Sequence, residues 1–171
     1  MRTIRNLMLP LVAALALGPG AAGGGTDGPS APSGLRPGQN WLLRGVDAGG
    51  REVLHSLTVA GQPQWDGRRW SAPTTLGRVV VSETVPLTLV VSASEAAGRT
   101  GLICFGVRDG DRHRGILLSG TLPQQREQAD RVAEAERRWR ATLPRPRGAT
   151  GREMQGWARA AGVGTCEAQV F

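Results

Sequence analysis

The sequence predicts a β-rich α+β domain: a single antiparallel meander sheet of six to eight strands, curled or barrel-like, covered by a C-terminal α-helix. Two observations lead to this fold class. From residue 40 to residue 119, short apolar runs are separated by connections of two to six residues. Parallel crossovers need roughly a dozen residues, so the strands are expected to be antiparallel. A segment near 123–143 then has the periodicity of an amphipathic helix, and a shorter helix is expected near 151–160.

Strands are expected where a short apolar run lies between turn residues. The expected strands cover residues 40–46, 51–60, 76–83, 87–94, 102–107, 114–119 and 165–171. An Asp-Gly dipeptide follows Trp65, and this dipeptide is a strong hairpin signal. Trp65 and Trp70 are therefore expected on the two arms of one hairpin.

Several of these strands are apolar without interruption, at residues 79–81, 89–91 and 116–118. A strand with one face in water should instead alternate between apolar and polar residues. We therefore expect part of the sheet to be covered on both sides.

The segment near 123–143 is expected to provide the cover on one side. Its apolar residues recur at helical spacing and form a stripe of Ala129, Val132, Ala135, Trp139 and Leu143. Thr121 and Gln124 have the spacing of a capping box, as do Thr150 and Glu153 before the second helix. Pro144 is expected to end the first helix.

The first 22 residues have the layout of a cleaved secretory signal peptide. Arg2 and Arg5 form a positive start, an apolar run of eleven residues extends from Leu7 to Leu17, and small residues follow. Residues 23–39 are rich in Gly and Pro and are expected to form a flexible leader. Residues 40–171 are expected to form one domain, exported to the periplasm or secreted.

The sequence has two cysteines, Cys104 and Cys166. An even number in an exported chain indicates a disulfide, although two separately buried thiols remain the alternative. A bridge would close a long loop between the middle of the domain and its C-terminus. Loop closure of this length is worth about 4 kcal/mol.

All 21 basic residues are arginine, and the sequence has no lysine, which codon bias in a GC-rich bacterial genome explains. Without the signal peptide the chain has 19 Arg and 14 acidic residues, a net charge of +5. This charge is compatible with ordinary solubility and does not indicate a nucleic-acid partner. No other apolar run approaches the length of a membrane span, so no transmembrane segment is expected in the mature chain.

His55 and His113 are the side chains that could act as general bases. His55 lies on the apolar face of an alternating strand, where a hydrogen-bonded structural role is the simpler explanation. His113 follows Asp109 and Asp111 in a turn, but this set matches no zinc or calcium spacing. Nucleophile-elbow, phosphate-loop and dinucleotide motifs are missing. The sequence therefore assigns no catalytic, metal-binding or cofactor-binding residue, and no cofactor is expected.

Six arginines without an intervening acid form the most basic segment of the chain. The arginine cluster consists of Arg137, Arg138, Arg140, Arg145, Arg147 and Arg152. Because arginine makes two-pronged contacts with carboxylates and phosphates, the cluster could bind an anionic envelope component. A solvated helix end is the other explanation.

Trp41, Trp65 and Trp70 could line an apolar pocket for a small ligand, or simply pack the core. An exported meander with a C-terminal helix and a disulfide resembles the lipocalins in architecture. Their hallmark is Gly-x-Trp at the first strand, whereas two residues separate Gly38 from Trp41 here. The motif is therefore absent, and the chain is not identified as a lipocalin.

These observations favour an exported bacterial cell-envelope protein that binds a partner or ligand without catalysis. Two alternatives remain open. One is a small exported hydrolase with a Ser/His/Asp-type site, and the other is a lipocalin-like carrier of a small apolar ligand.

Overall fold

The computed structural model describes residues 30–82, 87–93, 101–145 and 147–171. A short 3-10 helix, η1 (Ser33–Leu35), precedes nine strands and two α-helices. The strands are β1 (Asn40–Val46), β2 (Glu52–Thr58), β3 (Gln64–Trp65), β4 (Arg69–Thr74), β5 (Gly77–Ser82), β6 (Leu87–Ala93), β7 (Gly101–Asp109), β8 (Arg112–Gly120) and β9 (Gly164–Val170). The helices α2 (Leu122–Ala141) and α3 (Gly151–Ala160) lie between β8 and β9 in the chain. The expected signal peptide at 1–22 lies outside the described residues.

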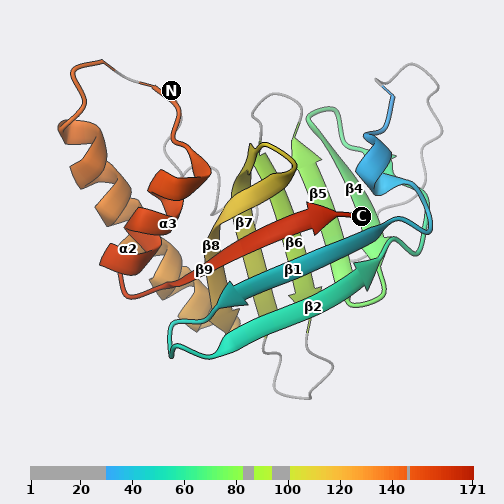
Figure 1. The fold of residues 1–171 in the computed structure, drawn as a ribbon, viewed down its shortest axis with the longest axis horizontal. Helices are drawn as coiled ribbons and strands as arrows, with labels where there is room; N and C mark the ends of the chain where they lie inside the picture. Colours follow the sequence, from blue (N-terminus) through green and yellow to red (C-terminus); the bar gives the residue numbers. More distant parts are fainter. Residues whose placement is uncertain (1–29, 83–86, 94–100, 146) are drawn as a thin grey trace.

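The strands form an antiparallel sheet in the order β2-β1-β9-β8-β7-β6-β5-β4-β3 (Figure 1). The prediction of an antiparallel, β-rich chain with C-terminal helices is confirmed. The simple meander of six to eight strands is wrong, because the described residues form nine strands and β9 lies between β1 and β8. Turn signals predict which consecutive strands pair, but they carry no information on where a C-terminal strand returns to the sheet.

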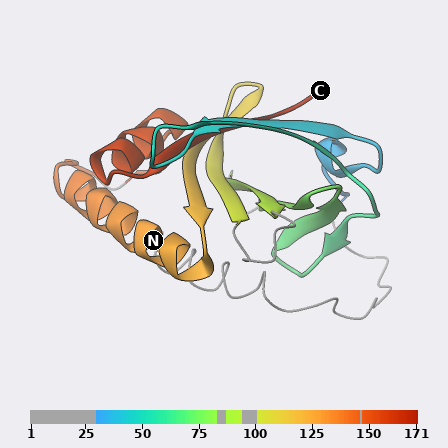
Figure 2. The same ribbon diagram turned by 90° about the horizontal axis from the view of Figure 1, so that it is seen from below.

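The sheet is strongly bent, so that β9, β1 and β2 cross over the strands β5 to β7 (Figures 1 and 2). At one end the chain after β2 reaches β4, where the backbone N–H of Ala60 donates to the carbonyl oxygen of Pro73. Val59 and Thr74 form an isolated bridge beside this bond. The described sheet is not closed into a complete barrel, since β2 and β3 stand at its two ends. We call the inner side of the bend the concave face and the outer side the convex face.

Both faces carry buried apolar side chains. The concave cluster contains Leu35, Trp41, Leu43, Leu57, Val59, Trp70, Ala72, Val79, Cys104, Leu117, Cys166 and Ala168. The convex cluster contains Val80, Ile103, Phe105, Ile116, Leu118, Val132, Met154, Trp157, Ala158 and Val163. Successive residues of one strand divide between the clusters: Leu117 is concave, whereas Ile116 and Leu118 are convex. The expectation that part of the sheet is covered on both sides is confirmed.

The two helices cover the convex face at one end of the sheet (Figure 2). The helix expected near 123–143 is α2, and the helix expected near 151–160 is α3, so both are confirmed. The second helix begins with a reciprocal capping box. Thr150 N–H donates to Glu153 Oε2 at 2.8 Å, and Glu153 N–H donates to Thr150 Oγ1 at 3.2 Å.

The apolar stripe of α2 faces the convex cluster. Val132 is fully buried, and the partly buried Ala129, Ala135 and Trp139 pack against the same cluster. Leu143, also expected in the stripe, follows the end of the helix. The predicted docking of α2 on the sheet is therefore confirmed for the residues within the helix.

Two buried glutamines of α2 complete the hydrogen bonding of the sheet. The Gln128 amide accepts from Ser119 N–H at 3.0 Å and donates to the Ser119 carbonyl oxygen at 2.9 Å. Gln125 Nε2 donates to the carbonyl oxygens of Gly101 and Gly120. Since β9 pairs with β8 only as far as Leu117, these amides satisfy backbone groups beyond the end of β9.

Glycines lie side by side where the sheet bends. Gly106 of β7 is opposite Gly115 of β8, which is opposite Cys166 of β9, and Gly45 of β1 is opposite Cys166 on its other side. A Cβ at Gly115 would overlap the carbonyl oxygen of Phe105, and a Cβ at Gly106 would lie 2.7 Å from the Arg114 carbonyl oxygen. The strands can approach this closely only because these positions lack side chains.

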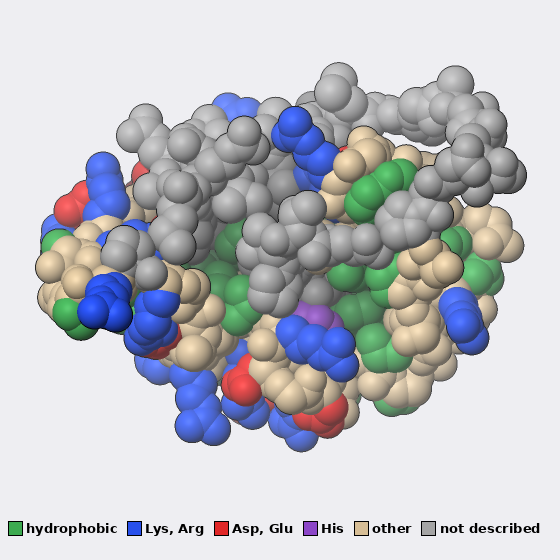
Figure 3. Space-filling view, turned by 90° about the horizontal axis from the view of Figure 1, so that it is seen from above, with side chains coloured by type: hydrophobic (Ala, Val, Ile, Leu, Met, Phe, Trp, Pro, Cys, Tyr) green, Lys and Arg blue, Asp and Glu red, His purple; other side chains and the backbone are tan. Residues whose placement is uncertain are grey.

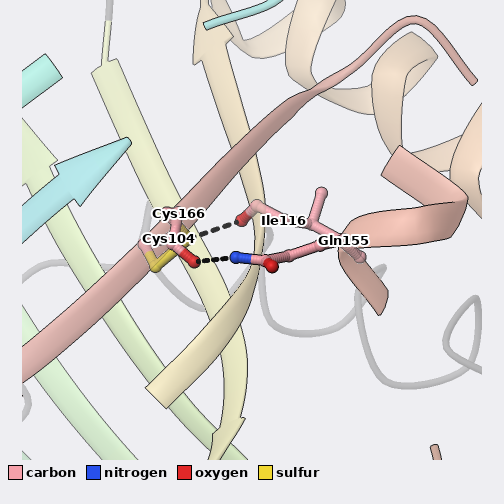
Figure 4. Close-up of a disulfide and its surroundings, with 4 residues drawn as sticks. All are labelled: Cys104, Ile116, Gln155 and Cys166. Atoms are coloured by element: carbon pink, nitrogen blue, oxygen red, sulfur yellow. Dashed lines mark hydrogen bonds between the residues drawn. A yellow bond between two sulfur atoms is a disulfide. The ribbon is translucent and has the colours of Figure 1, made fainter. Parts of the chain in front are cut away.

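The predicted disulfide between Cys104 and Cys166 is confirmed and lies on the concave face at this bend (Figure 4). Both cysteines are 1% exposed. Gln155 of α3 donates to the carbonyl oxygen of Cys166 at 3.1 Å, so the second helix also holds β9 at the bend.

The packed domain begins before the expected boundary at Asn40. Leu35 of η1 is fully buried in the concave cluster. The indole Nε1 of Trp41 donates to the carbonyl oxygen of Gly34 at 2.7 Å and fastens η1 to the sheet. One leucine in a Gly/Pro-rich segment is enough to anchor it, which composition alone does not show.

Candidate functional site

Both histidines of the chain lie in one row across the concave face. His113 of β8 is paired with Ala168 of β9, Ala168 with Leu43 of β1, and Leu43 with His55 of β2. On its other side, His113 is paired with Arg108 of β7. Residues directly opposite each other in antiparallel strands point to the same face, with Cβ atoms about 5 Å apart. The row therefore places Arg108 and His113 next to each other on the inner side of the bend.

His113 is half-buried against an aromatic ring. Its ring centroid lies 5.6 Å from that of Trp41, and its Nδ1 is buried without a hydrogen-bond partner among the described residues. Burial is the main reason why the pKa of His113 lies below its ordinary value, and the positive charge of Arg108 lowers it further. The carbonyl of Ala168, a hydrogen-bond partner of the ring, acts in the opposite direction on this pKa. The imidazole is therefore neutral at neutral pH.

The structure brings together the three tryptophans expected as a pocket lining. Trp65 and Trp70 are directly opposite each other in the β3–β4 hairpin, as predicted, with ring centroids 5.4 Å apart. Trp41 and Trp70 belong to the concave cluster, and the partly buried Trp65 packs against it. Figure 3 shows hydrophobic side chains gathered in the middle of the face seen from above, with a histidine side chain among them. Trp41 and Trp70 are 2% and 9% exposed and pack the core, whereas Trp65 is only partly buried.

The described strands place almost no charge on the concave face. Within the nine described strands, the three acidic residues Glu52, Asp109 and Glu167 occupy convex positions according to the strand register. Arg108 is the only arginine of these strands at a concave position. The concave positions of the described strands are therefore mostly apolar, with one cation beside a neutral imidazole.

The arginine cluster is largely paired with nearby acids. Arg137 and Arg138 both form ion pairs with Glu134. Arg140 donates through Nε to Oε1 of Glu136 at 2.7 Å, and that glutamate is 1% exposed. These three arginines stabilise α2 and leave little uncompensated charge on its last turns.

Arg147 connects the cluster to the second helix. It donates to Glu153 Oε2 at 2.9 Å, and its guanidinium lies 5.1 Å from the Trp139 ring centroid. The Arg147 hydrogen bond is the main reason why the pKa of Glu153 falls to about 2. Arg145 and Arg152 are exposed and form no ion pair with a described residue. The anion-binding interpretation stays a prediction and rests mainly on these last two arginines.

The turn carboxylates near His113 lie in an ion-pair network on the convex side. Asp109 accepts from Arg114 at 2.7 Å, and Arg114 also donates to Glu167 at 2.9 Å. The Glu167 hydrogen bond is the main cause that raises the pKa of Arg114 above its ordinary value. Asp111 accepts from Gln169 at 2.9 Å. These carboxylates are engaged away from the concave face.

The described part of the chain was searched for side-chain groups that could hold a metal ion or form a hydrolytic site. It contains no group of three or more His, Cys, Asp or Glu side chains that could hold a metal ion. Nδ1 of His113 has no hydrogen-bond partner among the described residues, whereas in a Ser/His/Asp site the carboxylate accepts from this nitrogen. None of the helices described is long and apolar enough to cross a membrane.

Arg108 is the site residue that sequence reasoning missed. The sequence predicts a turn at Asp109 and Asp111, and a two-residue loop at 110–111 pairs residue 108 with residue 113. Knowing the loop length would thus have placed Arg108 beside His113, although not on the concave face.

Comparisons with known proteins found no family model, no curated protein and no solved structure that matches the chain. The function is therefore argued from the geometry of this chain.

Proposed function

We propose that the protein is an exported, non-enzymatic binding protein of the bacterial cell envelope, and that its concave face holds a small apolar ligand. The observation that carries the ligand site is the partly exposed Trp65, which packs against the buried concave cluster containing Trp41 and Trp70, on strands that place one charged residue on this face. Ligand sites typically combine an aromatic, apolar lining with a few polar groups that fix orientation. The lining would include the partly buried residues around the cluster: Val53, Trp65, Leu76, Val81, Leu102 and Val170.

A binding function is favoured over hydrolysis because the concave face offers hydrophobic contact and few reactive groups. The Cys104–Cys166 disulfide is compatible with an oxidising compartment and supports export alongside the signal-like N-terminus. Export is tested by expressing the full chain in a bacterial host and measuring the mass of the exported product. We expect residues 1–22 to be missing, and an intact N-terminus would contradict the proposal.

Ligand binding is tested with the neutral probe N-phenylnaphthylamine, whose fluorescence rises in apolar sites. The protein is expected to bind it saturably, with one probe per chain. Trp65→Ala should weaken this binding about tenfold, because it removes apolar contact worth roughly 1.4 kcal/mol. Trp139→Ala is the matched control, since it removes a tryptophan from the convex side and should leave probe binding unchanged. Failure of the parent protein to bind any neutral apolar probe would contradict the proposed site.

A further inference from the structure

Arg108 has an exposed side chain at a concave position of β7, next to the β7–β8 turn. Its Nε donates to the carbonyl oxygen of Gly110 at 3.2 Å, and it forms no ion pair with a described residue. The acidic residues of the described strands lie on the convex face. No carboxylate of these strands therefore neutralises the charge of Arg108 on the concave face. A single positive charge beside an uncharged apolar surface attracts an anion and repels a cation.

His113 provides a second polar atom at the same place. It lies directly opposite Arg108, and its buried Nδ1 has no hydrogen-bond partner among the described residues. Buried polar atoms are normally hydrogen-bonded, so a ligand atom that pairs with Nδ1 would remove an unfavourable feature of the unliganded protein. The Trp41 ring beside His113 fixes the imidazole at the edge of the apolar cluster.

We propose that the ligand of the concave face is a small amphiphile with one carboxylate, which binds to Arg108 and His113 while its apolar body lies against the partly buried side chains around the concave cluster. This inference rests on the proposed function and adds the chemical class of the ligand. The guanidinium of Arg108 binds a carboxylate through two parallel hydrogen bonds. Because the other ring nitrogen of His113 donates to the carbonyl oxygen of Ala168, Nδ1 of the neutral ring carries no proton. The ring therefore takes up a proton from solvent on Nδ1 when the carboxylate binds, and this N–H donates to a carboxylate oxygen.

The test compares three probes with the same twelve-carbon chain: dodecanoate, dodecanol and dodecylammonium. Their affinities are measured by displacement of N-phenylnaphthylamine from the full chain. The parent protein is expected to bind dodecanoate about ten to a hundred times more tightly than dodecanol, the range that a charge-assisted hydrogen bond gives. Dodecylammonium should bind more weakly than dodecanol.

Two variants and one control assign the preference to these residues. Arg108→Gln should abolish the preference for dodecanoate, so that dodecanoate and dodecanol bind this variant with similar affinities. His113→Phe keeps a ring beside Trp41 and should weaken dodecanoate binding several-fold. Arg78→Gln, which removes an exposed arginine at a convex position of β5, should behave like the parent protein. Thermal melting of each variant checks that it is folded.

The possible results separate this inference from the proposed function. Equal affinities of the parent protein for dodecanoate and dodecanol would overturn the inference that the ligand has a carboxylate. The proposal of an apolar binding site would still stand. A dodecanoate preference that survives Arg108→Gln would overturn the assignment to this row. Failure to bind any of the three probes, together with failure to bind N-phenylnaphthylamine, would overturn both proposals.

Discussion

Cys104 and Cys166 are joined by a disulfide although β8 lies between the two strands that carry them. Their Cα atoms are 5.9 Å apart, whereas two strand spacings in a flat sheet amount to about 9.5 Å. The difference reflects the bend of the sheet, where Gly115 of β8 has no side chain to keep the strands apart. The disulfide therefore fastens the bend that creates the concave face.

Removal of this bridge should destabilise the protein strongly. The cysteines are 62 residues apart, and loop-closure entropy for this separation corresponds to about 4 kcal/mol. The double variant Cys104→Ala/Cys166→Ala is expected to lose about this free energy of unfolding in urea titrations. A loss below about 1 kcal/mol would mean that packing alone holds the bend.

Gly115→Ala should prevent normal folding or cost more than about 3 kcal/mol, since its Cβ would overlap the carbonyl oxygen of Phe105. The matched control is Gly156→Ala in α3, where a Cβ would meet nothing within 4 Å. That variant should be more stable than the parent protein by about 0.5–1 kcal/mol, because alanine favours helices over glycine. Equal stability of the two variants in thermal melts would contradict the tight bend.

Trp157 and Trp139 should contribute unequally to stability. Their ring centroids are 5.0 Å apart, but Trp157 is 5% exposed whereas Trp139 is only partly buried. Trp157→Ala is expected to lower the free energy of unfolding by about 3–5 kcal/mol, and Trp139→Ala by about 2 kcal/mol. Chemical denaturation of both variants measures this, and a larger loss for Trp139→Ala would count against the packing described.

Glu153 should make stability depend on acid pH. Its pKa is lowered from 4.5 to about 2, chiefly by the hydrogen bond from Arg147. The ionised carboxylate therefore stabilises the folded state above pH 4.5, and this contribution is lost as the pH falls from 4.5 toward 2.

Glu153→Gln tests this dependence, because glutamine keeps the capping box with Thr150 but cannot ionise. The variant should lose about 1 kcal/mol at neutral pH and should melt at a temperature that changes less between pH 5 and pH 2. Identical acid profiles for the variant and the parent protein would rule out this role.

The arginine cluster should bind anionic membranes more strongly at low salt. We expect binding to vesicles that contain phosphatidylglycerol, weakened at physiological salt because charges are then screened beyond about 8 Å. Arg145→Glu with Arg152→Glu should abolish the binding, since these two arginines form no ion pair with a described residue. Arg68→Glu with Arg78→Glu changes the charge equally elsewhere and is the control. Equal binding by both double variants would show that the arginine cluster is not a specific site for anionic membranes.

The sequence alone determined the features that depend on neighbours in the chain. The turn between Trp65 and Trp70, the two helices with their caps, and the uninterrupted apolar strands were all predicted and are confirmed. The disulfide was predicted from the cysteine count, since the chain has two cysteines and only one pairing. Turn type, helical periodicity and capping act over a few residues, so their signals can be read directly from the sequence.

The tertiary structure decided where β9 enters the sheet, how sharply the sheet bends, and which residues meet on the concave face. Arg108 and His113 are paired through a local turn, but their place beside Trp41 results from the insertion of β9 between β1 and β8. The partners of such a strand are set by the packing free energy of the whole domain. No local sequence pattern encodes the packing free energy of the whole domain, so the candidate site is visible only in the folded chain.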